Sequence, residues 1–193
     1  MMMKKLAGLL GLSLLIMCLN ACGTSSLGNG DLSTEATTQQ GEFTPSTNHL
    51  AMLNAINQAR SQPHICHTGE VAASSALDWN QALSGAAKTI VKNILARVDS
   101  GQLDLTKTAP PHEDSSGNRV GGRASNQGYD FARVGENLAY APHPSGDPLT
   151  VPVVQAWLGS SKGHCEEMLF ADYEDLGVYF ERGVWATVFG KAR

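Results

Sequence analysis

Apolar residues recur at three- and four-residue spacing in three segments of this 193-residue chain, which is the pattern of helices that bury one face. Residues 48–61 form the first segment. The second follows a capping residue, Asp78 or Asn80, and runs to about Leu95. The third is a short segment, 152–159, which starts with a proline and ends at a glycine. The pattern therefore predicts two long helices and one short, largely buried helix.

Two runs near the end of the chain, 176–181 and 184–189, are rich in the β-branched and aromatic residues that favour strands. Residues 181–183 between them read as a hairpin turn. Residues 99–126 are polar and rich in turn residues, which predicts a long loop. The order helix, helix, long loop, helix, strands predicts an α/β sandwich without the alternation of strand and helix that builds parallel sheets.

The start of the chain has the composition of an export signal. Two lysines precede an apolar run, residues 6–17, that is too short to span a bilayer as a stable anchor. Residues 19–22 (Leu-Asn-Ala-Cys) then resemble a lipobox, in which the cysteine is lipidated and becomes the new N-terminus. We therefore expect residues 1–21 to be a lipoprotein signal peptide and Cys22 to carry the lipid. Because Asn20 is uncommon in a lipobox, cleavage by an ordinary signal peptidase nearby is the alternative.

Residues 22–45 are rich in Gly, Ser, Thr and Gln and predict a flexible tether, which leaves residues 46–193 for the folded domain. Loss of residues 1–21 removes two lysines and no acids, so the net charge changes from −4 to −6. Such an acidic surface argues against nucleic acid as a partner, because nucleic-acid binding needs clustered cations. The sequence predicts an exported protein anchored to a membrane of the cell envelope, periplasmic or on the outer surface.

Two of the four cysteines fall in the folded domain, Cys66 and Cys165. In the oxidising compartments that exported proteins reach, two such cysteines usually pair. The competing interpretation is a pair of zinc-ligating thiolates, which lacks the close C-x-x-C spacing of known zinc sites. We therefore predict a disulfide.

The segment 159–163 matches the G-x-S-x-G pattern of serine hydrolases. In those enzymes a strand precedes the serine, and an acid and a histidine follow it in order. Here a predicted helix precedes Ser161, and the only later histidine is His164, with no acid between the two. We reject a serine hydrolase on these grounds.

Three other residues form the strongest candidate constellation: His112, Glu136 and His164. Two imidazoles and a carboxylate suit a divalent cation such as zinc, with water at the fourth position. Without a metal, the same groups could orient water or bind a polar ligand. Glu166 and Glu167 follow His164 closely and would add negative charge or a further ligand.

At these residues the chain resembles the CAP superfamily, the SCP-like domain of cysteine-rich secretory proteins, antigen 5 and plant pathogenesis-related-1 proteins. It is most similar to bacterial exported members, over residues 48–190. The motifs that carry the resemblance are Leu77-Asp78-Trp79-Asn80, His112, Gly135-Glu136-Asn137, Trp157 with Ser160, Gly163-His164, Leu176-Gly177-Val178 and the run from Trp185 to Gly190. The resemblance implies a three-layer α-β-α sandwich with a central cleft.

In the family this cleft often carries two histidines and two acids, and some members bind zinc or another divalent ion there. The resemblance places His112 and His164 at the histidine positions and Glu136 at the first acid. Ser160 stands at the position where other members have the second acid, and this departure is usual for bacterial members. Asn137 and Glu167 become neighbours of the cleft. The resemblance also implies that Cys66 and Cys165 match a cysteine pair of a bacterial subset.

Family members have been linked to several activities, so the resemblance leaves three hypotheses. The first is a ligand-binding or interaction module without catalysis, whose partners are the membrane, through the lipid, and a small apolar ligand or an envelope or host protein. The second is a metal-assisted, protease-like hydrolase that uses the same cleft. The third is a lipid or sterol carrier, which needs an exposed apolar groove.

Overall fold

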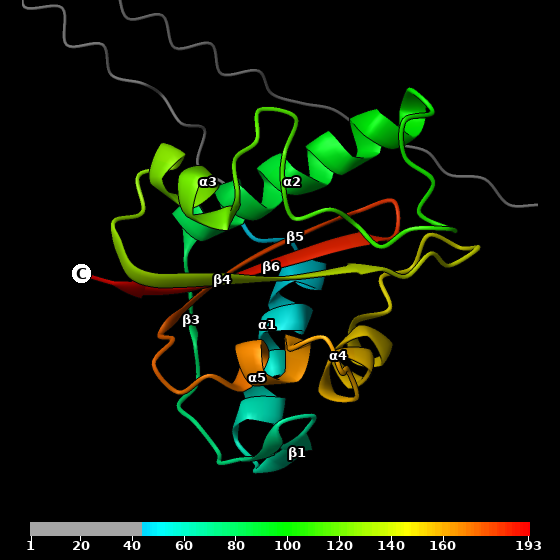
Figure 1. Ribbon diagram of the computed structural model, residues 1–193. Coiled ribbons are helices and arrows are strands. Elements are labelled where there is room, and N and C mark those ends of the chain that lie inside the picture. Colours follow the sequence, from blue (N-terminus) through cyan, green and yellow to red (C-terminus); the bar gives the residue numbers. More distant parts are fainter. Residues whose placement is uncertain (1–43) are drawn as a thin grey trace, which may run out of the picture. The chain divides into compact units, whose positions relative to one another are not determined.

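A computed structural model describes residues 44–193, which build a four-stranded sheet between two layers of helices (Figure 1). The predicted signal peptide, the lipidation site Cys22 and nearly all of the tether lie outside the described residues. The elements in chain order are α1 (Thr47–Arg60), β1 (His64–Cys66), β2 (Gly69–Val71), β3 (Asp78–Trp79), α2 (Gln81–Asp99), α3 (Val120–Asn126), β4 (Phe131–Tyr140), α4 (Thr150–Leu158), α5 (His164–Leu169), β5 (Asp175–Glu181) and β6 (Val184–Ala192).

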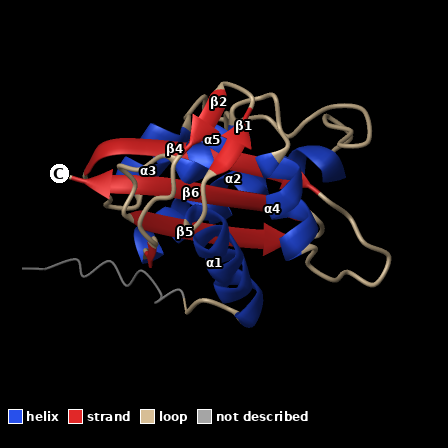
Figure 2. Ribbon diagram, turned by 90° about the horizontal axis from the view of Figure 1, so that it is seen from below, coloured by secondary structure: helices blue, strands red, loops and turns tan. Residues whose placement is uncertain are grey.

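The strands of the main sheet lie in the order β3-β5-β6-β4. The β5–β6 and β6–β4 pairs are antiparallel, and the short β3 joins β5 in parallel. Helices α2 and α3 cover one face of the sheet, and α1, α4 and α5 cover the other (Figures 1 and 2). This arrangement is the predicted three-layer α-β-α sandwich. It leaves β4 as the outermost strand of its side of the sheet.

Alternation along β6 shows how one strand serves both layers. Trp185 and Phe189 belong to the core beneath α1, α4 and α5. Val184, Ala186 and Val188 belong to the core beneath α2 and α3. Because successive side chains of a strand point to opposite faces, a sheet covered on both sides needs apolar residues at nearly every position. This explains why five of the six residues from 184 to 189 are apolar.

The predicted helices and hairpin are confirmed. The first helix spans Thr47–Arg60, and Asn80 caps α2 by accepting a hydrogen bond from the backbone N–H of Leu83 at 3.1 Å. The hairpin turn consists of Arg182 and Gly183, both with positive φ (49° and 81°), the signature of the turns that match strand twist. Strand β6 continues three residues past the predicted end.

Six elements differ from the predicted pattern, and three of them are the short strands β1, β2 and β3. The helix α3 lies inside the predicted loop 99–126, and α5, which the sequence did not predict, begins at His164. Helix α3 contains two adjacent glycines and no capping side chain, so its local propensity for helix is poor and tertiary packing must hold it. Strand β4 carries several polar residues and was not predicted as a strand at all.

The predicted disulfide joins Cys66 to Cys165. It links β1 to α5, and both cysteines are buried in the core beneath α1. The carboxylate of Glu166 reinforces this link, because its Oε1 accepts hydrogen bonds from the backbone N–H and the hydroxyl of Thr68, each at 2.9 Å. The α5 segment is therefore tied to the first half of the chain immediately beside His164.

His49 gives the fold a predicted acid sensitivity. Its ring is buried near Trp79, and its Nδ1 accepts a hydrogen bond from the backbone N–H of Ser46 at 3.2 Å. Burial lowers the pKa of His49 below its ordinary value, because desolvation disfavours the charged ring. The folded state therefore binds a proton less readily than the unfolded state. The resulting stabilisation is complete above the unfolded pKa of about 6.5 and is lost as the pH falls below it.

We expect the free energy of unfolding, measured in urea, to fall between pH 7.5 and pH 5, and the variant His49→Gln to show a shallower fall. His67→Gln, at an exposed position, serves as the control and should keep the wild-type slope. Identical slopes for His49→Gln and the wild type would contradict this account.

Candidate functional site

The candidate site is built around β4, whose neighbouring residues Glu136 and Asn137 point to opposite faces of the sheet. Glu136 pairs with Arg123 of α3 on one face. Asn137 donates from its Nδ2 to the backbone oxygen of His164, in α5 on the other face, at 2.9 Å. The strand thus brings together groups from both helical layers.

On the α3 side, a buried ion pair holds a half-exposed imidazole. Arg123 donates from its Nη2 to Glu136 Oε2 at 2.5 Å, and both side chains are almost completely buried. The other carboxylate oxygen, Oε1, lies 2.9 Å from His112 Nδ1. Arg123 also donates from its Nη1 to the backbone oxygens of His112 (3.0 Å) and Asn118 (2.7 Å). One guanidinium therefore fixes both the carboxylate and the backbone on which the histidine sits.

The loop that carries His112 is shaped by its own side chains. Asp114 Oδ1 accepts hydrogen bonds from the backbone N–H groups of Ser116 and Asn118, each at 2.9 Å. Asn93 of α2 donates to the hydroxyl of Ser115 at 2.7 Å. Such local turns position a segment without regular secondary structure.

On the other face, His164 is the first residue of α5. It follows Gly163, whose φ of 86° is a conformation that favours glycine. The hydroxyl oxygen of Ser160 lies 2.9 Å from His164 Nδ1. Burial lowers the pKa of His164, and repulsion from the protonated form of His112 lowers it further. Both influences disfavour the charged form of the His164 ring.

Glu167, predicted as a neighbour of the cleft, contacts β4 at Gly135. The hydroxyl of Tyr173 donates to Glu167 Oε1. A Cβ at Gly135 would collide with that carboxylate and with the Tyr173 hydroxyl, so the close approach of α5 to the strand requires glycine here. Burial and the Glu167 carboxylate raise the pKa of Tyr173 well above its ordinary value. We conclude that Glu167 packs against β4 at Gly135 and is held there by Tyr173.

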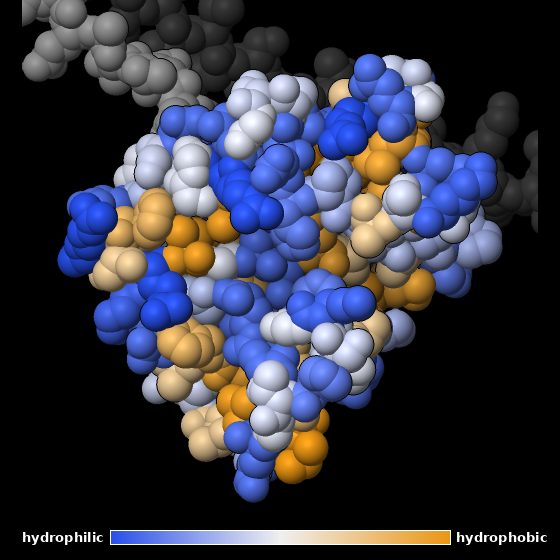
Figure 3. All heavy atoms as spheres, in the orientation of Figure 1, coloured by the Kyte–Doolittle hydropathy of each residue, from blue (hydrophilic) through white to orange (hydrophobic). Residues whose placement is uncertain are grey.

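A cavity of about 310 Å³ opens beside His164. Apolar and aromatic residues from the end of β4 and from α4 line most of it: Leu138, Ala139, Tyr140, Ala141, Pro152, Val153, Ala156 and Trp157. The Trp157 indole donates to the backbone oxygen of Leu138 at 3.3 Å, which joins α4 to the strand. On the face of the molecule that contains β4, polar residues run along the middle and apolar patches flank them (Figure 3).

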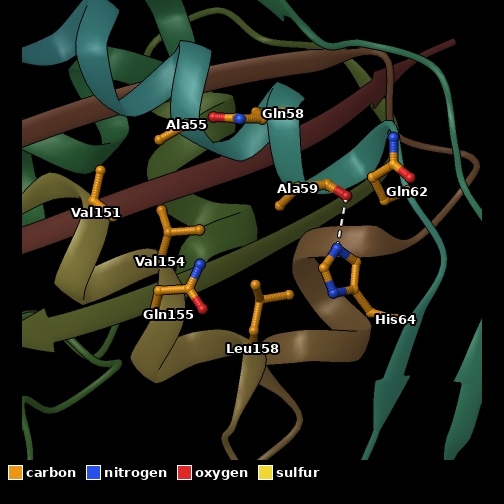
Figure 4. Close-up of a pocket in the computed structure, with 9 residues that line it drawn as sticks. All are labelled: Ala55, Gln58, Ala59, Gln62, His64, Val151, Val154, Gln155 and Leu158. Carbon is orange, nitrogen blue, oxygen red and sulfur yellow. Dashed lines mark hydrogen bonds between the residues drawn. The ribbon is translucent and has the colours of Figure 1, made fainter.

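A second hollow, of about 340 Å³, lies between α1 and α4 (Figure 4). Ala55, Val151, Val154 and Leu158 form its apolar part, and three glutamines contribute polar groups. His64 also lines it and hydrogen-bonds through Nε2 to the backbone oxygen of Ala59 at 2.9 Å. These two hollows, lined by residues of opposite faces of α4, are candidate ligand-binding sites.

The donor set at β4 does not fit the predicted three-ligand metal site. Both oxygens of Glu136 already serve Arg123 and His112, and Ser160 supplies a hydroxyl where an acid would be needed. Within residues 44–193, no three His, Cys, Asp or Glu side chains are grouped so as to hold a metal ion. What remains is two imidazoles. Divalent-metal binding therefore stays a prediction from the sequence, one that the donor set of the described residues does not favour.

Sequence reasoning missed Arg123, the residue that holds the α3 half of the site together. It lies in a Gly-rich polar stretch that predicts a loop, and nothing in that stretch marks an arginine for burial. Its ion pair with Glu136 spans 13 residues and two elements, so no local spacing could reveal it.

Comparison with known proteins agrees with this architecture. The sequence profile of the CAP (cysteine-rich secretory protein) family matches residues 53–184. A search of curated protein sequences found no match. Among solved structures, the chain is similar to an extracellular protein containing an SCP domain from Bacillus anthracis, with a TM-score of 0.53 and 23% identity, over 75% of this chain and 40% of that one.

It is also similar to an outer surface protein from Borrelia burgdorferi, with a TM-score of 0.51 and 19% identity, over 78% of this chain and 97% of that one. At these identities the structural likeness shows the fold alone. The family profile covers more than half of the chain and carries the assignment. The chain therefore belongs to the CAP family of cysteine-rich secretory proteins.

Proposed function

We propose that this CAP protein is an exported binding module of the cell envelope, whose ligand occupies the cleft along β4 between His112 and His164. The observation that carries the proposal is the cavity beside His164, since a mostly apolar hollow with a few polar groups is the usual form of a small-molecule site. The structurally similar proteins from Bacillus anthracis and Borrelia burgdorferi are described as extracellular and outer surface proteins, which supports export.

The contacts of His164 favour binding over hydrolysis. Ser160 touches the ring, but no carboxylate among residues 44–193 orients the ring from its other nitrogen. An activated serine needs a base that is itself held by a third group. The metal-assisted alternative needs a ligand set that Glu136 does not complete, because Arg123 already neutralises it.

The cavity can be tested with the uncharged fluorescent probe N-phenyl-1-naphthylamine, titrated into the purified full chain. We expect saturable binding that weakens at least about tenfold, or 1.4 kcal/mol, in Ala156→Trp, because the indole would fill the cavity. Gln155→Trp is a matched control. It changes the neighbouring exposed residue of α4, which lines the hollow of Figure 4 instead.

If probe binding were lost in Gln155→Trp but kept in Ala156→Trp, the ligand site would be the hollow between α1 and α4. That result would favour the second candidate function, carriage of an apolar ligand. The observation that favours this candidate is the exposure of Val151, 62%, at the apolar part of that hollow. A probe that binds neither hollow saturably would contradict both.

Membrane attachment through Cys22 is part of the proposal. None of the helices within residues 44–193 is long and apolar enough to cross a bilayer. We expect Cys22→Ala to move the protein from the membrane fraction to the soluble fraction of the cells, because a lipid anchor adds about 0.8 kcal/mol of membrane affinity for each buried CH₂ group. Unchanged membrane retention of Cys22→Ala, measured by fractionation and immunoblotting, would contradict lipidation.

A further inference from the structure

The hydrogen bonds of His112 fix where its ring carries a proton. Glu136 is paired with the buried Arg123 guanidinium, and an ionised carboxylate can only accept hydrogen bonds. The nitrogen that faces it, His112 Nδ1 at 2.9 Å, must therefore be an N–H donor. In the neutral ring this leaves Nε2 with a free lone pair, and Nε2 has no hydrogen-bond partner among residues 44–193.

The hydrogen bonds of His164 favour the opposite arrangement. Ser160 Oγ already accepts a hydrogen bond from the backbone N–H of Lys162 at 3.0 Å. Its own hydroxyl proton then has one acceptor within reach in the described part of the chain, His164 Nδ1 at 2.9 Å. If the serine donates to Nδ1, the proton of the neutral ring sits on Nε2. His164 Nε2 is then a donor, again without a protein partner in the described region.

We infer that the two histidines hold opposite tautomers, so that the cleft offers one hydrogen-bond acceptor at His112 and one donor at His164. Each free nitrogen suits a neutral polar group of a ligand: an O–H or N–H at His112, and a hydroxyl or carbonyl oxygen at His164. The inference rests on the proposed function, because it names the polar part of the ligand for the same cleft. Ser160 becomes a specificity-determining residue that positions the His164 proton.

The same geometry selects against a metal cation. A divalent cation binds the lone pair of a neutral imidazole nitrogen, and His164 presents an N–H at the nitrogen left free. An acid at position 160 would reverse this choice. A carboxylate accepts only, so it would draw the proton to Nδ1 and leave a lone pair on Nε2, as Glu136 does for His112.

The tautomers can be read without any ligand, from long-range proton–nitrogen NMR correlations of the ¹⁵N-histidine-labelled full chain at pH 7.5. We expect the proton on Nδ1 of His112 and on Nε2 of His164. In Ser160→Ala the preference of His164 for Nε2 should be lost, because its donor is gone. A proton on His164 Nδ1 in the wild type would overturn the inference.

Zinc titration gives a second readout. Ser160→Asp should move the His164 proton to Nδ1 and produce saturable Zn²⁺ binding that the wild type lacks, because partners of metal-bound histidines change metal affinity by about tenfold to a hundredfold. Ser161→Asp adds the same charge one residue away and should leave both the tautomer and the zinc affinity unchanged. Equal gains in both variants would show a general charge effect and overturn the role of Ser160. If the fluorescent probe did not bind but NMR showed the expected tautomers, the proposed function would be refuted and the tautomer inference would stand.

Discussion

Replacing Arg60 with alanine is expected to destabilise the domain by about 3–5 kcal/mol, because several backbone carbonyl groups lose their hydrogen-bond donor at once. The side chain is fully buried at the end of α1. It donates to four backbone oxygens: those of Ser75 (2.8 Å), Met168 (2.9 Å), Phe170 (3.0 Å) and Tyr173 (3.2 Å). Burial lowers its pKa, yet an arginine keeps its charge in proteins.

Without Arg60, four carbonyl groups would lose a donor, and each unsatisfied buried group costs about 1 kcal/mol or more. The loss should appear in urea unfolding and as a melting temperature lower by roughly 10 °C. Arg60→Lys should recover only part of the stability, because an ammonium cannot reproduce the planar fork of a guanidinium. Arg97→Ala, at the last turn of α2, is the control and should cost less than about 1 kcal/mol. A similar small loss for Arg60→Ala would contradict the role given to these contacts.

Loss of the disulfide is the second large effect. The bridge joins residues 99 positions apart, and the chain-entropy model assigns a loop of that length about 4–5 kcal/mol of stabilisation. We therefore expect Cys66→Ala to lower the melting temperature of the oxidised protein strongly. Because the bridge adjoins His164, the same variant should also loosen the α5 half of the cleft.

The reduced protein is the control for this prediction. Reductant should lower the melting temperature of the wild type to that of Cys66→Ala and leave the melting temperature of the variant unchanged. Cys66→Ala and the variant with both cysteines replaced should melt at the same temperature. The melting temperature of Cys66→Ala is compared with that of the wild type under oxidising and under reducing conditions. An equal difference under both conditions would mean that the effect comes from lost packing rather than from the bridge.

Local periodicity predicted the parts of the fold that bury one clear apolar face. The long helices α1 and α2 and the β5–β6 hairpin belong to this group. Strand β4 escaped prediction because it carries Arg133, Glu136 and Asn137, whose side chains serve tertiary contacts rather than an apolar face. Propensity could not find α3 either, because its two glycines oppose helix and its packing against α2 and β4 decides the outcome.

The sequence predicted only which residues belong to the site, from their types and from their order along the chain in the family that it resembles. Spacing along the chain could not show that His112 and Glu136 meet, because 24 residues separate them. The family resemblance supplied that pairing. It could not supply Arg123, which changes the chemistry by occupying the carboxylate that a metal would need. The hydroxyl of Ser160 has the same consequence on the His164 side.

The most direct test of the central claim, that the cleft is a pair of hydrogen-bonding imidazoles rather than a three-ligand metal centre, is zinc titration calorimetry on the full chain. His112→Ala and His164→Ala are titrated beside it. The account predicts no saturable one-to-one binding in the wild type and the same baseline in both variants. Saturable one-to-one binding in the wild type that disappears in both variants would contradict it and establish a metal centre at β4.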